Sequence, residues 1–264
     1  MVNNFLQFDV RKILVILTIF LIVSDRCPLA QAVNVPVQTD SIPFAPGERL
    51  RYALRWALVP AGEGILEVLP MESINGAEVY HFRLTAATNS FVDIFFKVRD
   101  LIDSYTDKDM THSIRYLKKQ HEGNTKRNVT VEFDWNGNRA HYKDEEKTET
   151  NEVLSGAFDP LSILYYARMA HHWKNDHVER PVSDGSKCVI GRAHIVQRER
   201  VEVFTGTYDT FLLEPEMEHI GGVFEKSRGA KIKVWITTDH RHIPVKIASK
   251  VIVGSFVGEL VAIE

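Results

Sequence analysis

Regular alternation between apolar and polar residues is the feature that most limits what this chain can fold into. Every second residue of segment 48–58 is apolar, and these residues are Leu50, Tyr52, Leu54, Trp56 and Leu58. The intervening positions hold Arg49, Arg51 and Arg55, which we expect to face solvent. Side chains of a strand point alternately to its two faces, so the segment is predicted to be a strand buried on one face.

Similar runs recur along the chain, separated by turn residues such as Asn75-Gly76, a pair typical of tight hairpins. Their spacing predicts about a dozen strands in one large antiparallel sheet. A flat sheet of that size is unfavourable, so we expect it to curl into an open or spiral barrel-like structure. The fold class is therefore mainly β.

One segment has the pattern of a helix. Asp159 can accept hydrogen bonds from a first helical turn and Pro160 fits the first helical position, which predicts a helix over residues 159–173. Leu161, Leu164 and Tyr165 follow at helical spacing, and we expect this face to pack on the concave side of the sheet. The alternative topology has two compact domains on either side of residue 155.

Three further segments lack a regular pattern. Residues 91–98 are apolar at nearly every position, which favours a strand or short segment covered on both sides. Residues 143–152 are almost entirely charged or polar and are predicted to be a solvated loop, and the Gly-flanked segment 221–229 is predicted to be a second loop.

The N-terminus has the pattern of a secretory signal. Arg11 and Lys12 precede an apolar run at 13–23, and Ala30-Gln31-Ala32 fits a cleavage site. The apolar run is too short for a stable membrane span, so we predict a signal peptide at 1–32, a flexible lead-in at 33–43, and a single mainly β domain at 44–264. These features predict a periplasmic protein without a transmembrane segment after cleavage.

Charge and cysteine content narrow the class of protein further. The net charge of −3 argues against a nucleic-acid partner, because such proteins carry a basic footprint. Cys188 is the only cysteine after residue 32, so no internal disulfide is expected in the exported chain. We expect Cys188 to be buried and inert, because it lies in an apolar strand without an activating motif.

Candidate catalytic and metal-binding groups do not assemble into a known pattern. His171, His172 and His177 lie close in sequence. His240 and His242 would share a strand face, but a third ligand at comparable spacing is missing. Asp100, Asp103, Asp107 and Asp109 form an acidic cluster that lacks the glycine and glutamate of a calcium loop. We assign no catalytic residue, metal or cofactor, and a non-enzymatic protein is the leading interpretation. A hydrolase that uses Asp100 and Asp103, or His240 and His242, is the alternative.

Four motifs resemble the bacterial envelope family catalogued as domain of unknown function 3108. They centre on Pro46-Gly47-Glu48 with Trp56, on Val98-Arg99-Asp100 with Tyr105, on Phe158-Asp159-Pro160 with Arg168, and on Trp235 with Pro244-Val245. The resemblance implies an exported, mostly β protein and no established activity. The last motif is also similar to the C-terminal end of LolA-type periplasmic lipoprotein carriers, which implies an incomplete barrel that holds acyl chains.

A curled sheet has a concave face that one short helix cannot fill. We therefore expect a groove for an apolar ligand, a lipid or acyl chain, between the strands. The aromatic residues predicted to line it are Trp56, Phe96, Tyr116, Phe133 and Trp235. A scaffold that binds other envelope proteins is the alternative within the non-enzymatic class.

Overall fold

The computed structural model of the chain describes residues 42–169, 177–216, 231–251 and 254–264. The predicted signal peptide, most of the predicted lead-in, the end of the predicted helix and the predicted loop at 221–229 lie outside the described residues. Fourteen strands form a single antiparallel sheet in the order β8-β7-β6-β5-β4-β3-β2-β1-β14-β13-β12-β11-β10-β9. The mainly β prediction is confirmed, and the sheet is not closed into a barrel.

The first half of the chain forms a continuous antiparallel meander with one short helix. Its elements are β1 (Arg49–Trp56), β2 (Val59–Ile74), β3 (Ala77–Thr88), α1 (Ser90–Asp93), β4 (Arg99–Asp107), β5 (Ser113–Glu122), β6 (Thr125–Asp134), β7 (Arg139–Lys143) and β8 (Thr148–Glu152).

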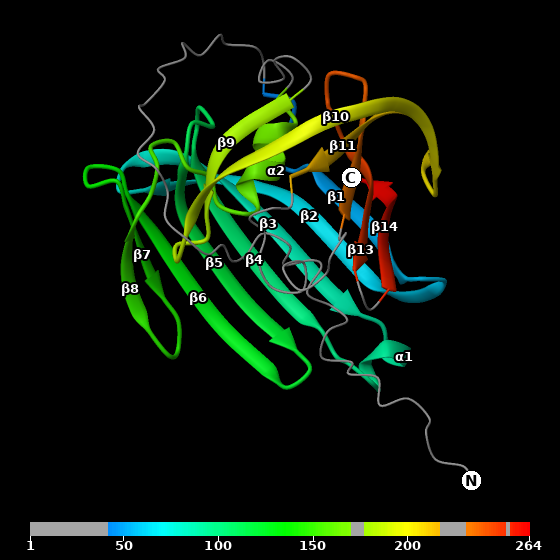
Figure 1. Cartoon of the computed structure of the whole chain (residues 1–264), viewed down its shortest axis with the longest axis horizontal. Helices are drawn as coiled ribbons and strands as arrows, with labels where there is room; N and C mark the ends of the chain where they lie inside the picture. Colours follow the sequence, from blue (N-terminus) through cyan, green and yellow to red (C-terminus); the bar gives the residue numbers. More distant parts are fainter. Residues whose placement is uncertain (1–41, 170–176, 217–230, 252–253) are drawn as a thin grey trace.

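The second half begins with the main helix and returns along the other side of β1. Its elements are α2 (Ser162–Ala167), β9 (His177–Ser183), β10 (Cys188–Val203), β11 (Gly206–Pro215), β12 (Lys231–Thr237), β13 (Pro244–Val251) and β14 (Gly254–Ile263). The two halves meet where β1 pairs with β14, from Leu50 opposite Ile263 to Trp56 opposite Phe256. Figure 1 shows the sheet curving around α2.

The hairpin expected at Asn75-Gly76 joins β2 to β3. Both residues have positive φ, 53° and 82°, which is the backbone shape that the right-handed twist of a tight hairpin requires. Asparagine and glycine reach this region at low cost, so the local sequence sets the turn and, through it, the pairing of Ile74 with Ala77.

The structure corrects three local expectations. Residues 148–152, predicted to be part of a loop, form the edge strand β8, whose charged side chains hinder pairing with another chain. Residues 91–98, predicted to be covered on both sides, contain α1 and leave Phe91, Ile94 and Phe95 exposed. Cys188 is half-buried, and its Sγ accepts a hydrogen bond from Leu154 N.

The arginines of β1 are held in ion pairs instead of pointing freely into solvent. Arg49 contacts Glu264 at 2.7 Å, and Arg51 contacts Glu63 at 2.7 Å. Arg55 contacts Glu259 at 2.5 Å and is also among the residues that line an internal cavity. The pairing of β1 with β2 shifts between Leu54 and Arg55, and this irregularity interrupts the simple alternation that the sequence predicted.

Candidate functional site

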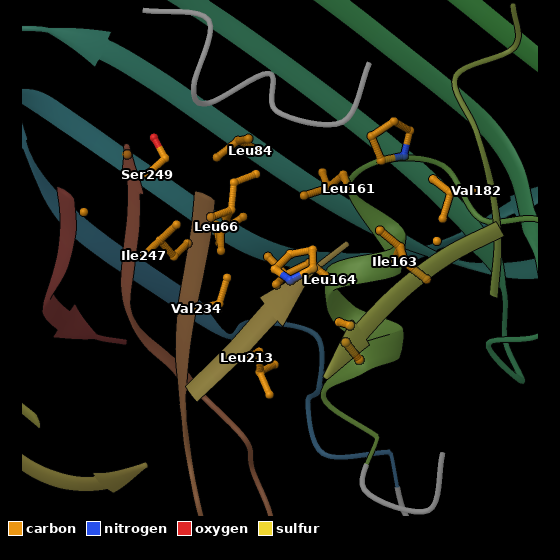
Figure 2. A pocket seen from close by; sticks show the side chains of 18 of the residues that line it. Leu66, Leu84, Leu161, Ile163, Leu164, Val182, Leu213, Val234, Ile247 and Ser249 are labelled. Carbon is orange, nitrogen blue, oxygen red and sulfur yellow. The ribbon is translucent and has the colours of Figure 1, made fainter. Parts of the chain in front are cut away.

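A cavity of about 280 Å³ lies between the concave face of the sheet and α2. Figure 2 shows aliphatic side chains from both halves of the chain around it, among them Leu66 and Leu84 of β2 and β3 and Val234 and Ile247 of β12 and β13. Its lining is mostly aliphatic and comes from β1–β4, α2 and β9–β14. This composition and concave position are typical of small-molecule binding sites.

Two faces of α2 have different surroundings. Tyr165 and Tyr166 are buried in the core, and the Tyr165 ring stacks on Phe82 with centroids 3.9 Å apart. Ile163 and Leu164 are only half-buried and line the cavity, as Figure 2 shows. The helix is therefore attached to the sheet by its aromatic face and presents an aliphatic face to the cavity.

A buried carboxylate fixes the start of this segment. Asp159 Oδ2 accepts hydrogen bonds from the hydroxyls of Ser104, Ser113 and Ser162 at 2.5, 2.6 and 2.8 Å. Its Oδ1 accepts from the backbone N–H groups of Leu161 and Ser162 at 2.9 and 3.0 Å. Burial raises the pKa of Asp159, and the hydrogen bonds oppose that shift without cancelling it.

A buried arginine fixes the end of α2. Arg168, whose side chain is 1% exposed, donates to both carboxylate oxygens of Glu48 at 2.6 and 2.9 Å. Its guanidinium also donates to the carbonyl of Arg241 and lies 5.2 Å from the Phe44 ring centroid. A planar fork of donors is needed to satisfy all these partners, which explains arginine at this position.

These contacts correct the helix predicted over 159–173. The helix α2 covers only Ser162–Ala167, because Asp159 and Pro160 belong to the turn before it and Arg168 turns toward Glu48. The N–H groups of Arg168 and Met169 bond three residues back, to Tyr165 and Tyr166, so the last turn is tighter than an α-helical one. Of the face expected to pack on the sheet, Leu161 and Tyr165 are buried, whereas Leu164 is only half-buried and lines the cavity.

Polar groups in the cavity wall are few. Ser249 is 3% exposed, lines the cavity, and its Oγ has no hydrogen-bond partner among the described residues. The charged residues of the lining are mostly engaged by protein groups. Arg180 donates to the Tyr166 hydroxyl at 2.5 Å, and Arg192 contacts Glu179 and Glu216.

A family model described as "Protein of unknown function (DUF3108)" matches residues 51–261, most of the sheet and all of the cavity wall. The chain belongs to the DUF3108 family.

Solved structures extend this result at the level of the fold. The crystal structure of a beta-barrel-like protein of domain of unknown function DUF1849 from Brucella abortus matches 82% of the DUF3108 chain and 96% of its own, with a TM-score of 0.53 and 11% identity. A hypothetical protein from Chlamydia trachomatis matches 83% of the chain and 87% of its own at 8% identity, but its TM-score is only 0.33. No curated protein gave a significant match. The first likeness supports a barrel-like fold and nothing about activity.

None of the five aromatic residues predicted to bind a ligand is in the lining of this cavity in the DUF3108 structure. Tyr116, Phe133 and Phe96 are buried, and Phe96 lies against Gly123 of the β5–β6 turn. Trp56 stacks on Phe256, and Trp235 donates its indole N–H to Glu199 at 2.7 Å. A ligand role for these five residues stays a prediction.

The carboxylates singled out in the sequence are not brought together. Asp100 and Asp103 are an odd number of positions apart on β4, so they point to opposite faces. Asp103 contacts His81 and Arg83, both at 2.7 Å. Burial alone would raise the pKa of Asp103, but these two hydrogen bonds outweigh it and lower the pKa.

Asp100 instead has Glu122 as its neighbour. Both side chains are buried, and Asp100 accepts a hydrogen bond from His121 N at 2.8 Å. Burial and then the negative charge of Asp100 raise the pKa of Glu122 to about 7. Lys118 lies close to this pair, and its pKa is lowered by burial. Asp100 and Glu122 are hydrogen-bonded to each other, but the described residues place no activated nucleophile beside them.

The histidines occupy separate environments. His240 is exposed, whereas His242 is buried and its Nδ1 lies 2.8 Å from the carbonyl of Arg168. His171 and His172 lie outside the described residues. Across the part of the chain that the structure describes, no three His, Cys, Asp or Glu side chains are grouped so as to hold a metal ion. Nor does any helix in that part have the length and apolarity needed to cross a membrane.

Sequence reasoning missed the aliphatic wall of the cavity. Val189, Ile190, Val234 and Ile247 lie on strands that the alternation predicted, but alternation cannot tell a core-packing face from one that borders an empty space. The one available signal was the neighbouring pair Ile163 and Leu164, because a helix that buries the Tyr165 side must turn part of this pair elsewhere.

Proposed function

We propose that this DUF3108 protein is an exported envelope protein that binds an apolar ligand, such as a lipid acyl chain, in the cavity between α2 and the sheet. The observation that carries the proposal is the half-buried aliphatic lining of that cavity, including Ile163, Leu164, Val234 and Ile247. A ligand that covered these side chains would gain about 0.8 kcal/mol for each CH₂ group removed from water.

Size and polarity fit a chain-like ligand. The cavity of about 280 Å³ is near the lower end of ligand pockets, which span roughly 300–1,000 Å³. A mostly aliphatic wall, in which the buried Ser249 hydroxyl lacks a partner among the described residues, suits a hydrocarbon segment better than a strongly polar metabolite. The sequence similarity of the C-terminal motif to LolA-type carriers points to the same ligand class.

Export rests on the sequence of the N-terminus. The basic residues Arg11 and Lys12, the apolar run at 13–23 and the Ala30-Gln31-Ala32 site support cleavage after Ala32 and a periplasmic location. N-terminal sequencing of protein recovered from the periplasm tests this part. A chain that retains residues 1–32 would refute it.

Filling the cavity tests ligand binding. We expect Leu164→Trp to weaken binding of a fluorescent fatty acid at least ten-fold, because the larger ring would occupy space that the ligand needs. Val196→Trp is the matched control, since Val196 is 51% exposed on β10 and is not in the lining. Thermal unfolding of both variants checks that each folds.

Native mass spectrometry of protein purified from the envelope gives an independent test. A co-purifying lipid that is present in the wild type and Val196→Trp, and depleted in Leu164→Trp, is the expected result. A mass without ligand, together with no binding of the fluorescent fatty acid, would exclude the proposal.

A further inference from the structure

A group of exposed apolar side chains lies at one end of the molecule. Leu58 in the β1–β2 turn and Val59 at the start of β2 are 94% and 40% exposed, and Phe91, Ile94 and Phe95, in and after α1, are 59%, 75% and 63% exposed. We call these five residues the apolar tip. Large apolar side chains are seldom gathered on a free surface, and such a cluster usually marks an interaction site.

Two hydrogen bonds donated by Asn89 hold the start of α1 next to the start of β2. Asn89 Nδ2 donates to the carbonyl of Pro60 at 2.7 Å, and Asn89 N donates to the carbonyl of Ala61 at 2.9 Å. The Asn89 side chain also accepts from Val92 N at 2.9 Å and caps α1. In Figure 1, α1 lies near the β1–β2 turn at the lower right of the sheet.

The contacts that attach α1 to the sheet leave its apolar side chains exposed. Phe96 N bonds to the carbonyl of Val92, and the buried Phe96 ring holds the end of this segment against the β5–β6 turn. The rings of Phe91 and Phe95 contact each other edge to face at 5.7 Å and stay outside. A fixed backbone therefore presents these side chains to solvent, although nothing in the described fold covers them.

Basic side chains flank the apolar tip on two sides. Lys97 lies four residues after α1, and its carbonyl accepts from Gly123 N, which places Lys126 of β6 at the same end. On the other side, Lys250 pairs with Ser255, whose carbonyl accepts from Ala57 N beside Leu58. All three lysines are exposed, whereas Asp93, the acidic residue of α1, is paired with Arg99 at 2.6 Å.

We propose that the apolar tip docks on an anionic lipid bilayer. Exposed Phe, Leu and Ile beside lysines are the combination that enters a membrane interface, with rings among the acyl chains and ammonium groups among the phosphates. The lysine flanks favour this occupant over a second copy of the chain, which would bring like charges together. Ala61 and Thr88, which border the two segments of the tip, also line the cavity, so docking would place that end of the cavity near the bilayer. The docking itself does not depend on a ligand in the cavity.

Vesicle flotation of the full chain measures how much the apolar side chains and the lysines each contribute to membrane binding. The variant Phe91→Ser, Ile94→Ser, Phe95→Ser should bind phosphatidylcholine vesicles containing phosphatidylglycerol roughly ten-fold or more weaker than the wild type. Replacing Lys97, Lys126 and Lys250 by Gln should abolish the preference for phosphatidylglycerol. Val196→Ser with Phe204→Ser is the matched control, because these residues are exposed on the far hairpin of β10 and β11.

A tryptophan placed in the apolar tip distinguishes membrane binding by the tip from binding by the apolar run at 13–23, which the wild type and all variants contain. Phe95→Trp should gain quenching by brominated phosphatidylcholine above the level of the wild type, whose four tryptophans give the baseline, and Phe204→Trp should not. Equal quenching of the two variants would overturn the proposal. So would sedimentation that shows the wild type dimerising and the serine variant monomeric, since the tip would then bind a second copy.

Discussion

Glu122 and Asp100 place two carboxyl groups side by side on the sheet face that also carries Ile102, a residue of the cavity wall. Such a pair is costly when both groups are charged, because burial removes water and the charges repel. Two neighbours offset part of this cost. Lys118 lies near both carboxyl groups, and Asp100 accepts a hydrogen bond from His121 N. The stability of the fold is therefore expected to depend on the protonation of this pair.

The pKa of Glu122 predicts how stability changes with pH. The folded state raises this pKa from 4.5 to about 7, so the folded protein binds the proton more tightly than the unfolded chain does. The stability that this tighter proton binding contributes is fully present below about pH 4.5 and is lost as pH rises through 7. We expect Glu122→Gln, which mimics the protonated acid, to flatten the fall in urea midpoint between these pH values.

The exposed Glu78 provides the comparison for that measurement. Glu78→Gln keeps the same change of charge on a surface side chain and should leave the slope as in the wild type. A slope that is equal in the wild type and Glu122→Gln would show that another group carries the pH dependence.

The element that depends most on buried polar contacts is α2. It has only six residues, too few for stable helix formation by its own backbone bonds, so its position relies on tertiary contacts. Asp159 joins it to β4 and β5 through Ser104 and Ser113, and Arg168 joins it to Glu48 ahead of β1. The helix is one wall of the cavity, so these contacts also define the cavity.

Removing the Asp159 carboxylate should therefore be strongly destabilising. Asp159→Ala leaves three hydroxyls and two backbone N–H groups without their acceptor, and we expect a loss of about 3 kcal/mol or more in the free energy of unfolding. Urea denaturation measures the loss. Asp109→Ala, which removes an exposed carboxylate paired only with Lys108 in the described contacts, should change stability by less than about 0.5 kcal/mol. Similar losses in the two variants would contradict this account.

At the scale of the whole molecule, the two ends of the sheet are joined without strand pairing between β8 and β9. Asn151 Nδ2 of β8 donates to the carbonyl of Gly185 in the β9–β10 turn at 2.9 Å. Phe158 N donates to the carbonyl of Pro181, and Ser183 N donates to the carbonyl of Phe158. This turn lies against Val131 of β6, so side-chain and loop contacts hold the curl of the sheet where a closed barrel would have a ladder.

A substitution at Gly185 tests how tightly the β9–β10 turn packs against β6. An added Cβ would lie 2.6 Å from the Val131 methyl groups, in addition to the strain of a side chain at a φ of +86°. Gly185→Ala should cost about 1 kcal/mol for the backbone and a further 1–3 kcal/mol for overpacking. Gly76→Ala, at a φ of +82° with open space around it, should show the backbone cost alone.

Removing the Val131 methyl groups should restore part of the stability that Gly185→Ala loses. We expect Gly185→Ala with Val131→Ala to be less destabilised than the sum of the two single variants, because the deleted methyl groups are those that the new Cβ meets. Strict additivity in urea denaturation would show that the turn moves away from β6 instead of pressing against it.

The sequence by itself determined most of the strands, the hairpin at Asn75-Gly76, the presence of a helix after Asp159 and the mainly β class. These features depend on periodicity and on the preferred backbone angles of single residues, which are local. It also predicted that a long sheet must curl, because twist accumulates over many strands. The charged strand β8 escaped prediction because its strand conformation comes from pairing with β7 and from no apolar pattern of its own.

Only the tertiary structure decided where the cavity lies and which side chains border it. Aromatic residues such as Tyr116 and Phe133 pack into the core, whereas the aliphatic Leu164 and Ile247 face the space that α2 and the sheet leave between them. Tyr116, Phe133 and Ile247 all lie on strands, and alternation in sequence does not separate the first two from the third. Whether an apolar side chain meets another side chain or an open volume depends on the distance between elements remote in the chain, and that distance is set by contacts such as Arg168 with Glu48, 120 residues apart.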